Sequence, residues 1–336
     1  MKKLLLLFLS LTILSCASNN HIPGTPEATG ETATIYAKSI TTADLKSRLY
    51  IFASDEFEGR NTGEPGQKKA ADFLKNFYIN AGIPSPLGGD DYFQDIATEF
   101  LRPNLKPSEN VLAFVEGSEK PEEIIVISAH LDHLGVVDGE IYNGADDDGS
   151  GNVAILEIAE AFQKAVENGN GPKRSILFLH VTGEEKGLLG SKYYVNHPIF
   201  PLANTVANLN IDMIGRVDDA HEKKPEFVYL IGSDKLSSEL HSLSEDINHK
   251  FTKLDLDYRY NDEDDPNRFY YRSDHYNFAK NNIPIIFYFN GTHDNYHRPS
   301  DTPDKINYEI LQKRTKLIFY TAWELANREN RITVDK

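Results

Sequence analysis

The stretch IIVISAHLDH, residues 124–133, decides the fold. It opens with an apolar, β-branched run of the kind found in strands buried on both faces, and His130, Asp132 and His133 follow where that run ends. Three further runs have the same form: SILFLHV (175–181), VANLNID (206–212) and IPIIFYF (283–289). Ligands of open α/β sheets bind beyond the carboxyl ends of the strands, so we expect the polar residues after these runs to meet in one crevice.

Strand patterns alternate with helix patterns along most of the chain. The other expected strands are 111–116 and 227–231, and the expected helices are 41–54, 64–81, 150–167, 187–196, 234–249 and 304–328. The alternation predicts an α/β fold with a mixed, mostly parallel sheet and helices on both faces. No linker composition interrupts residues 41–330, which we therefore expect to form a single domain.

The composition is that of an ordinary globular protein with an acidic surplus. The 336 residues include 35 basic and 51 acidic side chains, which gives a formal charge of −16. An acidic chain argues against a nucleic-acid partner, because phosphate binding needs a basic face. Nothing in the composition indicates an obligate protein partner.

The N-terminus reads as a targeting segment. A basic start is followed by an apolar run over 4–14, which is too short to span a bilayer, and then by Ser15 and Cys16. This pattern resembles a bacterial lipobox, so we expect residues 1–16 to be a lipoprotein signal peptide and Cys16 to be lipidated. The polar stretch 17–40 is expected to be a flexible tether. The protein would then be exported and lipid-anchored in the cell envelope, facing the periplasm or in the outer membrane.

The acids and histidines at the strand ends predict a metal centre. Two carboxylates about 4 Å apart repel by roughly 4 kcal/mol at an effective dielectric constant near 20, so a gathering of them either takes up protons or holds a cation. Carboxylates mixed with imidazoles suit zinc or a similar transition metal, whereas a carboxylate-only site suits calcium or magnesium. Cys16 is the only cysteine, which excludes a cysteine-based structural zinc site.

Six ordered motifs carry a resemblance to a known family. They are SAHLDHLG (128–135), NGADDDGSG (143–151), TGEEKGLLGS (182–191), NIDMIG (210–215), RSDHYNFA (272–279) and GTHDNYHRPSDTPDKI (291–306). Together they resemble the co-catalytic di-zinc aminopeptidases, the bacterial leucine aminopeptidase and aminopeptidase Y type, over roughly residues 45–328. The resemblance implies a zinc-exopeptidase, phosphorylase/hydrolase-like fold and a metallo-aminopeptidase that removes N-terminal residues from peptides.

The resemblance also implies a set of site residues. Two Zn²⁺ ions, or Co²⁺ or Mn²⁺, would be bridged by Asp147. The other metal ligands would be His130 and Asp212 at one site and Glu185 and His297 at the other. Glu184 would be the general base. Asp132 would hydrogen-bond the far nitrogen of His130, and the peptide bond after Asp147 would be cis.

The same resemblance suggests where substrate binds. Tyr296 would stabilise the developing oxyanion, and Asp274 would contact substrate. The aromatic and acidic segment 254–272 is expected to be a lid-like loop near the pocket mouth. The short spans before His130 leave no room for the protease-associated domain that many relatives carry.

Three other functions stay open at this point. A glutaminyl-cyclase-like acyltransferase would use a single zinc, a receptor-like domain would be catalytically inactive, and a calcium-binding surface lipoprotein would use no histidine ligands. No ligand of the di-zinc set is missing here, which favours the peptidase. The prediction fails if the imidazoles of His130 and His297 lie on opposite sides of the molecule, or if Asp147 points into solvent.

Overall fold

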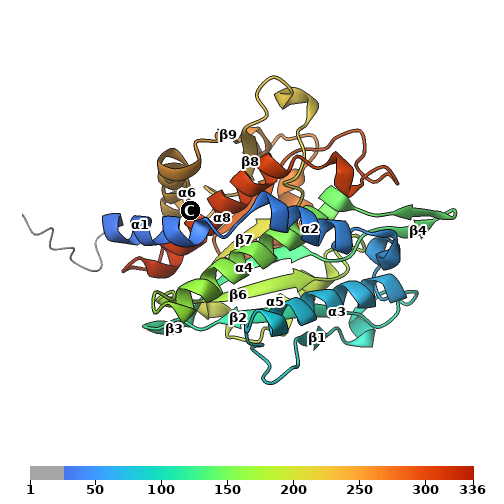
Figure 1. The fold of residues 1–336 in the computed structure, drawn as a ribbon, viewed down its shortest axis with the longest axis horizontal. Coiled ribbons are helices and arrows are strands. Elements are labelled where there is room, and N and C mark those ends of the chain that lie inside the picture. The colour runs from blue at the N-terminus through green and yellow to red at the C-terminus, as the bar shows by residue number, and fades with distance from the viewer. Residues whose placement is uncertain (1–25) are drawn as a thin grey trace, which may run out of the picture.

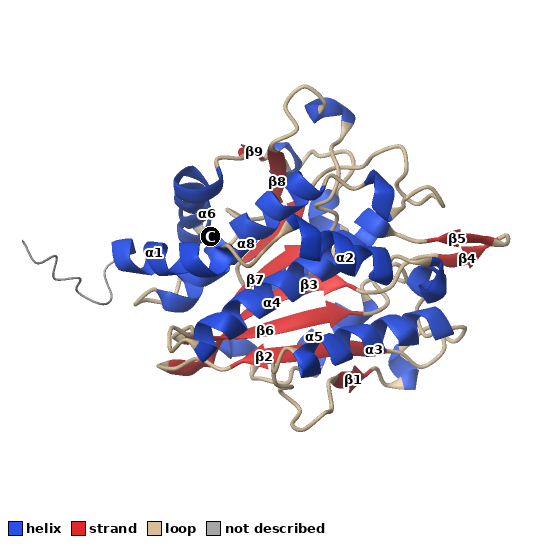
Figure 2. Cartoon of the chain, viewed as in Figure 1, coloured by secondary structure: helices blue, strands red, loops and turns tan. Residues whose placement is uncertain are grey.

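A twisted eight-stranded sheet forms the centre of the computed structural model, which describes residues 26–336 (Figures 1 and 2). The strand order is β1-β2-β6-β3-β7-β10-β8-β9. The strands are β1 (Phe93–Asp95), β2 (Glu109–Val115), β3 (Lys120–His130), β6 (Arg174–Val181), β7 (Thr205–Ile211), β8 (Phe227–Ile231), β9 (Asp255–Asp257) and β10 (Ile285–Phe289). A separate hairpin, β4 (Gly135–Val137) and β5 (Glu140–Tyr142), projects from the body.

The sheet is mixed, as predicted. The central strands β6, β3, β7 and β10 run parallel, whereas β2 and β8 lie antiparallel to their neighbours β6 and β10. The six expected strands are all present. The sequence did not predict the three-residue strands β1, β4, β5 and β9, which are too short to show a period.

Helices cover both faces of the sheet, which confirms the predicted layering. The helices are α1 (Pro26–Ala37), α2 (Thr42–Phe52), α3 (Pro65–Asn80), α4 (Gly151–Glu167), α5 (Leu189–Asn196), α6 (Ser238–Ile247), α7 (His275–Ala279) and α8 (Tyr308–Asn327). Alternate strand residues point to opposite faces, so Ile125 and Ile127 pack beneath α4 and α8 while Ile124 and Val126 pack with α5 and α7 on the other side.

Residues 26–37 correct the expected tether. They form α1, which packs against α8 and α4 rather than extending freely. Ala33, Tyr36 and Ala37 are buried, and the Tyr36 ring stacks on Trp323 at 5.7 Å. The sequence of α1 has only a weak amphipathic pattern, which is why it did not predict a helix; packing against a partner surface through these buried side chains stabilises it. The signal peptide, Cys16 and residues 17–25 lie outside the described residues.

Candidate metal centre

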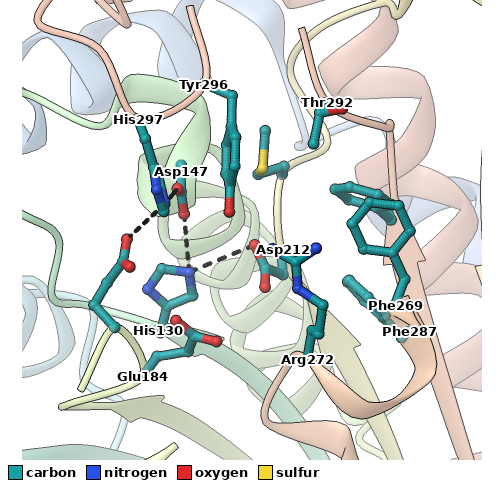
Figure 3. Close-up of a pocket in the computed structure, with 13 residues that line it drawn as sticks. His130, Asp147, Glu184, Asp212, Phe269, Arg272, Phe287, Thr292, Tyr296 and His297 are labelled. Atoms are coloured by element: carbon teal, nitrogen blue, oxygen red, sulfur yellow. Dashed lines mark ion pairs between the residues drawn. The ribbon is translucent and has the colours of Figure 1, made fainter. Parts of the chain in front are cut away.

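The parallel strands bring the predicted ligands to one edge of the sheet (Figure 3). His130 is the last residue of β3, Asp212 follows β7, and Glu184 and Glu185 follow β6. His297 comes from the loop after β10. All four of these strands are parallel and end at the same edge, so side chains far apart in sequence line a single pocket.

Asp147 lies between two imidazoles. It sits in the irregular turn over residues 145–150 that leads into α4, and its peptide bond to Asp148 is cis, as expected. Its Oδ1 is 3.1 Å from His130 Nε2, and its Oδ2 is 3.0 Å from His297 Nε2. The Asp147 side chain is 4% exposed, and the two imidazoles lie on the same carboxylate, so neither condition under which the sequence prediction would fail holds.

The first cluster joins His130, Asp147 and Asp212. His130 Nε2 is 3.5 Å from Asp212 Oδ1. Asp148 is also within reach of these groups, but its oxygens accept the backbone N–H groups of His130 (3.2 Å), Gly151 (3.0 Å) and Met213 (3.0 Å). Asp148 therefore fixes the loop, and Asp147 is the better candidate ligand.

The second cluster joins Asp147, Glu185 and His297, and it contains a further residue. His297 Nε2 is 3.2 Å from Glu185 Oε1. His133 Nδ1 lies 3.0 Å from the same Glu185 oxygen and 3.7 Å from Asp147 Oδ2. His133 was not among the predicted ligands, although it stands three residues after His130 in the motif that decides the fold.

Opposite charges stabilise each other in this second cluster. Burial alone would lower the pKa of His297, but its contacts with Asp147 and Glu185 raise that pKa to about 10. Burial works to raise the pKa of Asp147, yet His133, His130 and His297 hold it well below its usual value. Ionised carboxylates packed among imidazoles are groups that a divalent cation can bind.

The donor atoms fit zinc. The ligand sets contain imidazole nitrogens and carboxylate oxygens and no sulfur, which zinc and related transition metals accept. Asp147 Oδ2 and Glu185 Oε1 are buried and have no hydrogen-bond partner among residues 26–336. Buried polar atoms rarely remain unpaired, so these two oxygens indicate a bound cation.

Asp132 contacts the far nitrogen of His130, and it does so through its backbone. His130 Nδ1 lies 3.0 Å from the backbone carbonyl of Asp132, not from its carboxylate. The chain turns directly after β3, which brings this carbonyl beneath the ring. The Asp132 carboxylate instead accepts hydrogen bonds from Thr62 Oγ1 (2.7 Å) and from the backbone N–H of Glu184 (3.1 Å). Asp132 therefore positions the segment that carries the candidate base.

Glu184 belongs to neither cluster but faces both. Its carboxyl group lies beside His130 in the pocket (Figure 3). Burial raises the pKa of Glu184 well above its usual value, and the charges of Asp212 and Asp274 add to this effect while His130 opposes it. A carboxylate that holds a proton more firmly than usual suits a general base.

An aromatic pocket with a cavity volume of about 40 Å³ opens beside the clusters. Its apolar wall consists of Met213, Phe269, Phe287 and Phe289. The Tyr296 ring stacks on His297 at 3.9 Å, and its hydroxyl points toward Asp147 and Asp212 (Figure 3). Burial and these carboxylates raise the pKa of Tyr296, so its hydroxyl keeps its proton. Phe269 and Arg272 place the end of segment 254–272 at the pocket, as expected.

Asp274 does not line this pocket. Its side chain is fully buried, and it accepts a hydrogen bond from Ser191 Oγ, which in turn accepts one from Asn277 Nδ2. The motif around it does lie near the site, but the carboxylate faces inward at the start of α7 (His275–Ala279). The structure therefore gives Asp274 a supporting position rather than a substrate contact.

Two acids that the sequence analysis did not select hold the Asp147 loop. The Asp301 carboxylate accepts the backbone N–H groups of Asp146 (3.0 Å) and Asp147 (3.2 Å). Asp146 accepts the Gly215 N–H at 2.7 Å and lies 3.1 Å from His293 Nε2. Neither acid follows a predicted strand, so no sequence signal marked their role.

Comparisons with known proteins agree with this arrangement. The model of peptidase family M28 matches residues 110–322. The leupeptin-inactivating enzyme 1 of Streptomyces exfoliatus is 27% identical over 300 residues, which cover 83% of this chain and 60% of that enzyme. The chain thus spans about 60% of the length of this curated relative.

Two solved structures show the same fold. The Legionella pneumophila LapA aminopeptidase superposes with a TM-score of 0.70 at 24% identity, covering 90% of this chain and 76% of that one. The Porphyromonas gingivalis glutaminyl cyclase superposes with a TM-score of 0.64 at 20% identity, covering 84% and 98%. At these identities the likeness speaks for the fold alone.

Proposed function

The chain belongs to peptidase family M28, and we propose that it is a zinc-dependent exopeptidase, an aminopeptidase that hydrolyses N-terminal residues of peptides. One observation carries the proposal. The two oxygens of Asp147 lie 3.1 and 3.0 Å from the imidazoles of two separate clusters, which is the arrangement of a carboxylate that bridges two metal ions.

We propose that two zinc ions bind. His130, Asp147 and Asp212 would hold one, and Asp147, Glu185 and His297 would hold the other. Bound zinc supplies Lewis acidity that polarises a carbonyl group and makes a water molecule easier to deprotonate. Co²⁺ and Mn²⁺ accept the same donor atoms and are the alternatives.

The chain's own residues supply the remaining chemistry. Glu184 accepts the proton of the attacking water and returns it to the leaving amine. Tyr296 donates its hydroxyl hydrogen to the carbonyl oxygen as negative charge develops there. The wall formed by Met213, Phe269, Phe287 and Phe289 receives an apolar side chain of the substrate.

Two assays on the full chain test this function against its nearest alternative. An aminoacyl-nitroanilide reports aminopeptidase activity, and a peptide with N-terminal glutamine reports cyclisation. We expect hydrolysis of the first, lost on chelation and restored by zinc, and no cyclisation of the second. Cyclisation with one zinc per chain would favour the cyclase, which does not need the cluster around His130. Fewer than one zinc per chain and no turnover would favour the inactive, receptor-like domain.

The N-terminus supports a separate proposal about location. Cys16 follows a short apolar run, so we propose that the mature protein is lipid-anchored in the cell envelope, facing the periplasm or in the outer membrane. In a bacterial host, the full chain should sediment with membranes and incorporate labelled fatty acid. A Cys16→Ser variant should do neither, and a variant that stays membrane-bound would refute the anchor. Among residues 26–336, no helix has both the length and the apolarity needed to cross a membrane.

A further inference from the structure

His133 is a buried side chain next to the pocket. The proposed set of metal ligands does not explain its position. It is 0% exposed, and neither ring nitrogen has a hydrogen-bond partner among residues 26–336. A polar group that is buried without a hydrogen bond destabilises the folded protein, so a buried imidazole without such partners is uncommon. Its Nδ1 nevertheless faces two carboxylate oxygens.

The contacts around His133 do not have the geometry of hydrogen bonds. Its Nδ1 is 3.0 Å from Glu185 Oε1, which would suffice for a hydrogen bond, but neither atom makes one with any residue between 26 and 336. The N–H direction therefore does not point along the line to the oxygen. The contact between His133 and Glu185 is therefore an ion pair without ideal hydrogen-bond geometry, and it does not by itself account for the position of the ring.

Two imidazole nitrogens instead lie close to the same two carboxylate oxygens. His133 Nδ1 lies 3.0 Å from Glu185 Oε1 and 3.7 Å from Asp147 Oδ2. His297 Nε2 lies 3.2 and 3.0 Å from the same two oxygens. Zinc bonds of about 2.0–2.1 Å at tetrahedral angles place neighbouring ligand atoms about 3.3 Å apart. The four distances scatter around that value.

The local backbone is built to admit the His133 ring. Gly144 has a φ of +53°, and a Cβ atom there would come within 2.6 Å of the imidazole and 2.2 Å of the Asp147 carbonyl oxygen. The glycine thus allows the ring and the Asp147 turn to pack directly against each other. The backbone N–H of His133 is held by the Arg60 carbonyl at 3.2 Å.

We propose that His133 is a direct ligand of the second metal ion, which would then be held by four protein atoms: His133 Nδ1, His297 Nε2, Asp147 Oδ2 and Glu185 Oε1. The inference rests on the proposed function, because it assumes that the cluster holds zinc. The first site, with His130, Asp147 and Asp212, keeps three protein ligands. Closed four-ligand sites are typical of tightly held zinc, and three-ligand sites keep an open position. The open position therefore lies on the His130 side, next to Glu184.

The direct test counts imidazoles around zinc in the full chain. After chelation, one equivalent of zinc is added and the metal is examined by X-ray absorption spectroscopy. We expect two imidazoles per zinc in the native sequence and one in His133→Gln. One imidazole per zinc in the native sequence both at one and at two equivalents would overturn the proposal, because zinc in the first site alone also has one imidazole. This readout needs no variant to fold. If His133 only contacted the zinc ligands without binding zinc, the number of imidazoles per zinc would be the same in His133→Gln as in the native sequence.

A competition titration with a zinc chelator gives a second, independent readout. His133→Gln should weaken the tighter zinc-binding step at least about tenfold, because even the outer partners of zinc ligands contribute 10- to 100-fold. The matched control is His221→Gln, which removes another buried imidazole that lies 2.7 Å from a carboxylate oxygen of Asp218. The control should bind zinc as the native chain does. Equal affinity in His133→Gln and the control would overturn the proposal.

The two proposals fail in different ways. If the native chain binds no zinc and cleaves no peptide, the peptidase function itself is wrong. If it binds two zinc ions and releases N-terminal residues but shows one imidazole per zinc at both one and two equivalents, only the role of His133 is wrong.

Discussion

In the proposed mechanism, Glu184 is the residue on which turnover depends most directly. It faces both clusters without belonging to either, and burial raises its pKa well above the usual value. Asp132 holds its backbone N–H at 3.1 Å, so the carboxylate is presented by a fixed loop. A group in this position can move a proton between water and the leaving amine without being needed for metal binding.

The Glu184→Gln substitution should therefore separate chemistry from binding. It keeps the shape of the side chain but removes the proton acceptor, and we expect kcat to fall by about 10²–10⁴-fold. Zinc content and Tm should stay at native values. Glu140→Gln, on the exposed hairpin, is the control and should leave all three unchanged. A variant that retains full turnover would remove Glu184 from the mechanism.

His180 links the metal loop to the core. Its Nε2 lies 2.6 Å from the Tyr78 hydroxyl, and its Nδ1 lies 2.6 Å from Asn152 Oδ1. The amide nitrogen of Asn152 donates to the carbonyls of His130 (2.6 Å) and Asp148 (2.7 Å), so the Asn152 oxygen must accept from His180. Nδ1 therefore carries the proton, and Tyr78 donates to Nε2.

This buried, neutral histidine predicts acid sensitivity. Burial lowers the pKa of His180 from 6.5 to about 3. Below pH 6.5 the His180 imidazole is protonated in the unfolded chain but stays neutral in the folded chain. The contribution of neutral His180 to the free energy of unfolding is therefore fully present above pH 6.5 and is lost as the pH falls toward 3. At pH 5 the loss is about 2 kcal/mol.

Denaturant unfolding of the native chain and of His180→Gln at pH 7.5 and pH 5 measures that loss. The variant should lose less free energy of unfolding between the two pH values, by about 2 kcal/mol. Protonation of residues in the metal clusters changes the free energy of unfolding of both proteins, so it cancels when the two losses are subtracted. Equal losses in the two proteins would show that His180 does not contribute.

The sequence predicted the site residues that lie at the ends of strands. His130 and Asp212 lie at strand ends, where parallel neighbours converge, and this convergence can be argued from periodicity alone. His133 and the Asp132 carboxylate lie past the end of β3, where the chain turns and the alternation of faces no longer applies. Their directions depend on the loop conformation, which the sequence pattern does not contain.

Arg60 organises three segments behind the metal centre. It ends the short helical turn Asp55–Arg60, and its guanidinium is fully buried. It donates to the carbonyls of Leu131 (2.9 Å), Asn143 (2.6 Å) and Gly144 (2.9 Å). Burial lowers its pKa to about 10, opposed by the charges of Asp147 and neighbouring acids, so it stays positively charged at neutral pH.

Replacing Arg60 should therefore lower the free energy of unfolding by more than the loss of one positive charge alone would. Arg60→Met leaves buried carbonyls without a donor and removes the positive charge beneath the acids, so we expect a loss of at least about 3 kcal/mol in unfolding free energy. Arg60→Lys keeps the charge but not the planar fork, and should recover part of this loss. The exposed Arg102→Met is the control. An Arg60→Met variant as stable as this control, measured by urea unfolding, would contradict the role.

At the level of elements, long periodic segments were predicted and short ones were not. α4 (Gly151–Glu167) and β3 carry strong patterns, and both appear within a few residues of their expected ends. α1 was expected to be part of a flexible tether because its own sequence barely favours a helix. Its stability comes from packing, with Tyr36 on Trp323, a contact across nearly the whole chain.

At the scale of the whole molecule, part of the acidic surplus is buried around the metal centre. Asp146, Asp147, Asp148 and Asp301 are all buried within one loop system, next to Asp212. Arg60 offsets only part of this charge. Bound cations would offset more, because each neutralises carboxylates that otherwise repel one another in the interior.

The stability of the molecule should therefore depend on zinc. A ligand that binds only the folded state at 100 times its Kd adds about 2.7 kcal/mol per site, and for two sites this corresponds to roughly 5–10 °C in Tm. Chelation of the full chain should lower the Tm by this amount, and zinc should restore it. Calcium should not, because it prefers sites made of oxygen ligands alone. Asp147→Asn, which weakens the bridging ligand, should show little response to zinc. A Tm that is the same with chelator and with zinc in the native chain would mean that the metals do not bind the folded state, and the two-zinc proposal would fail with it.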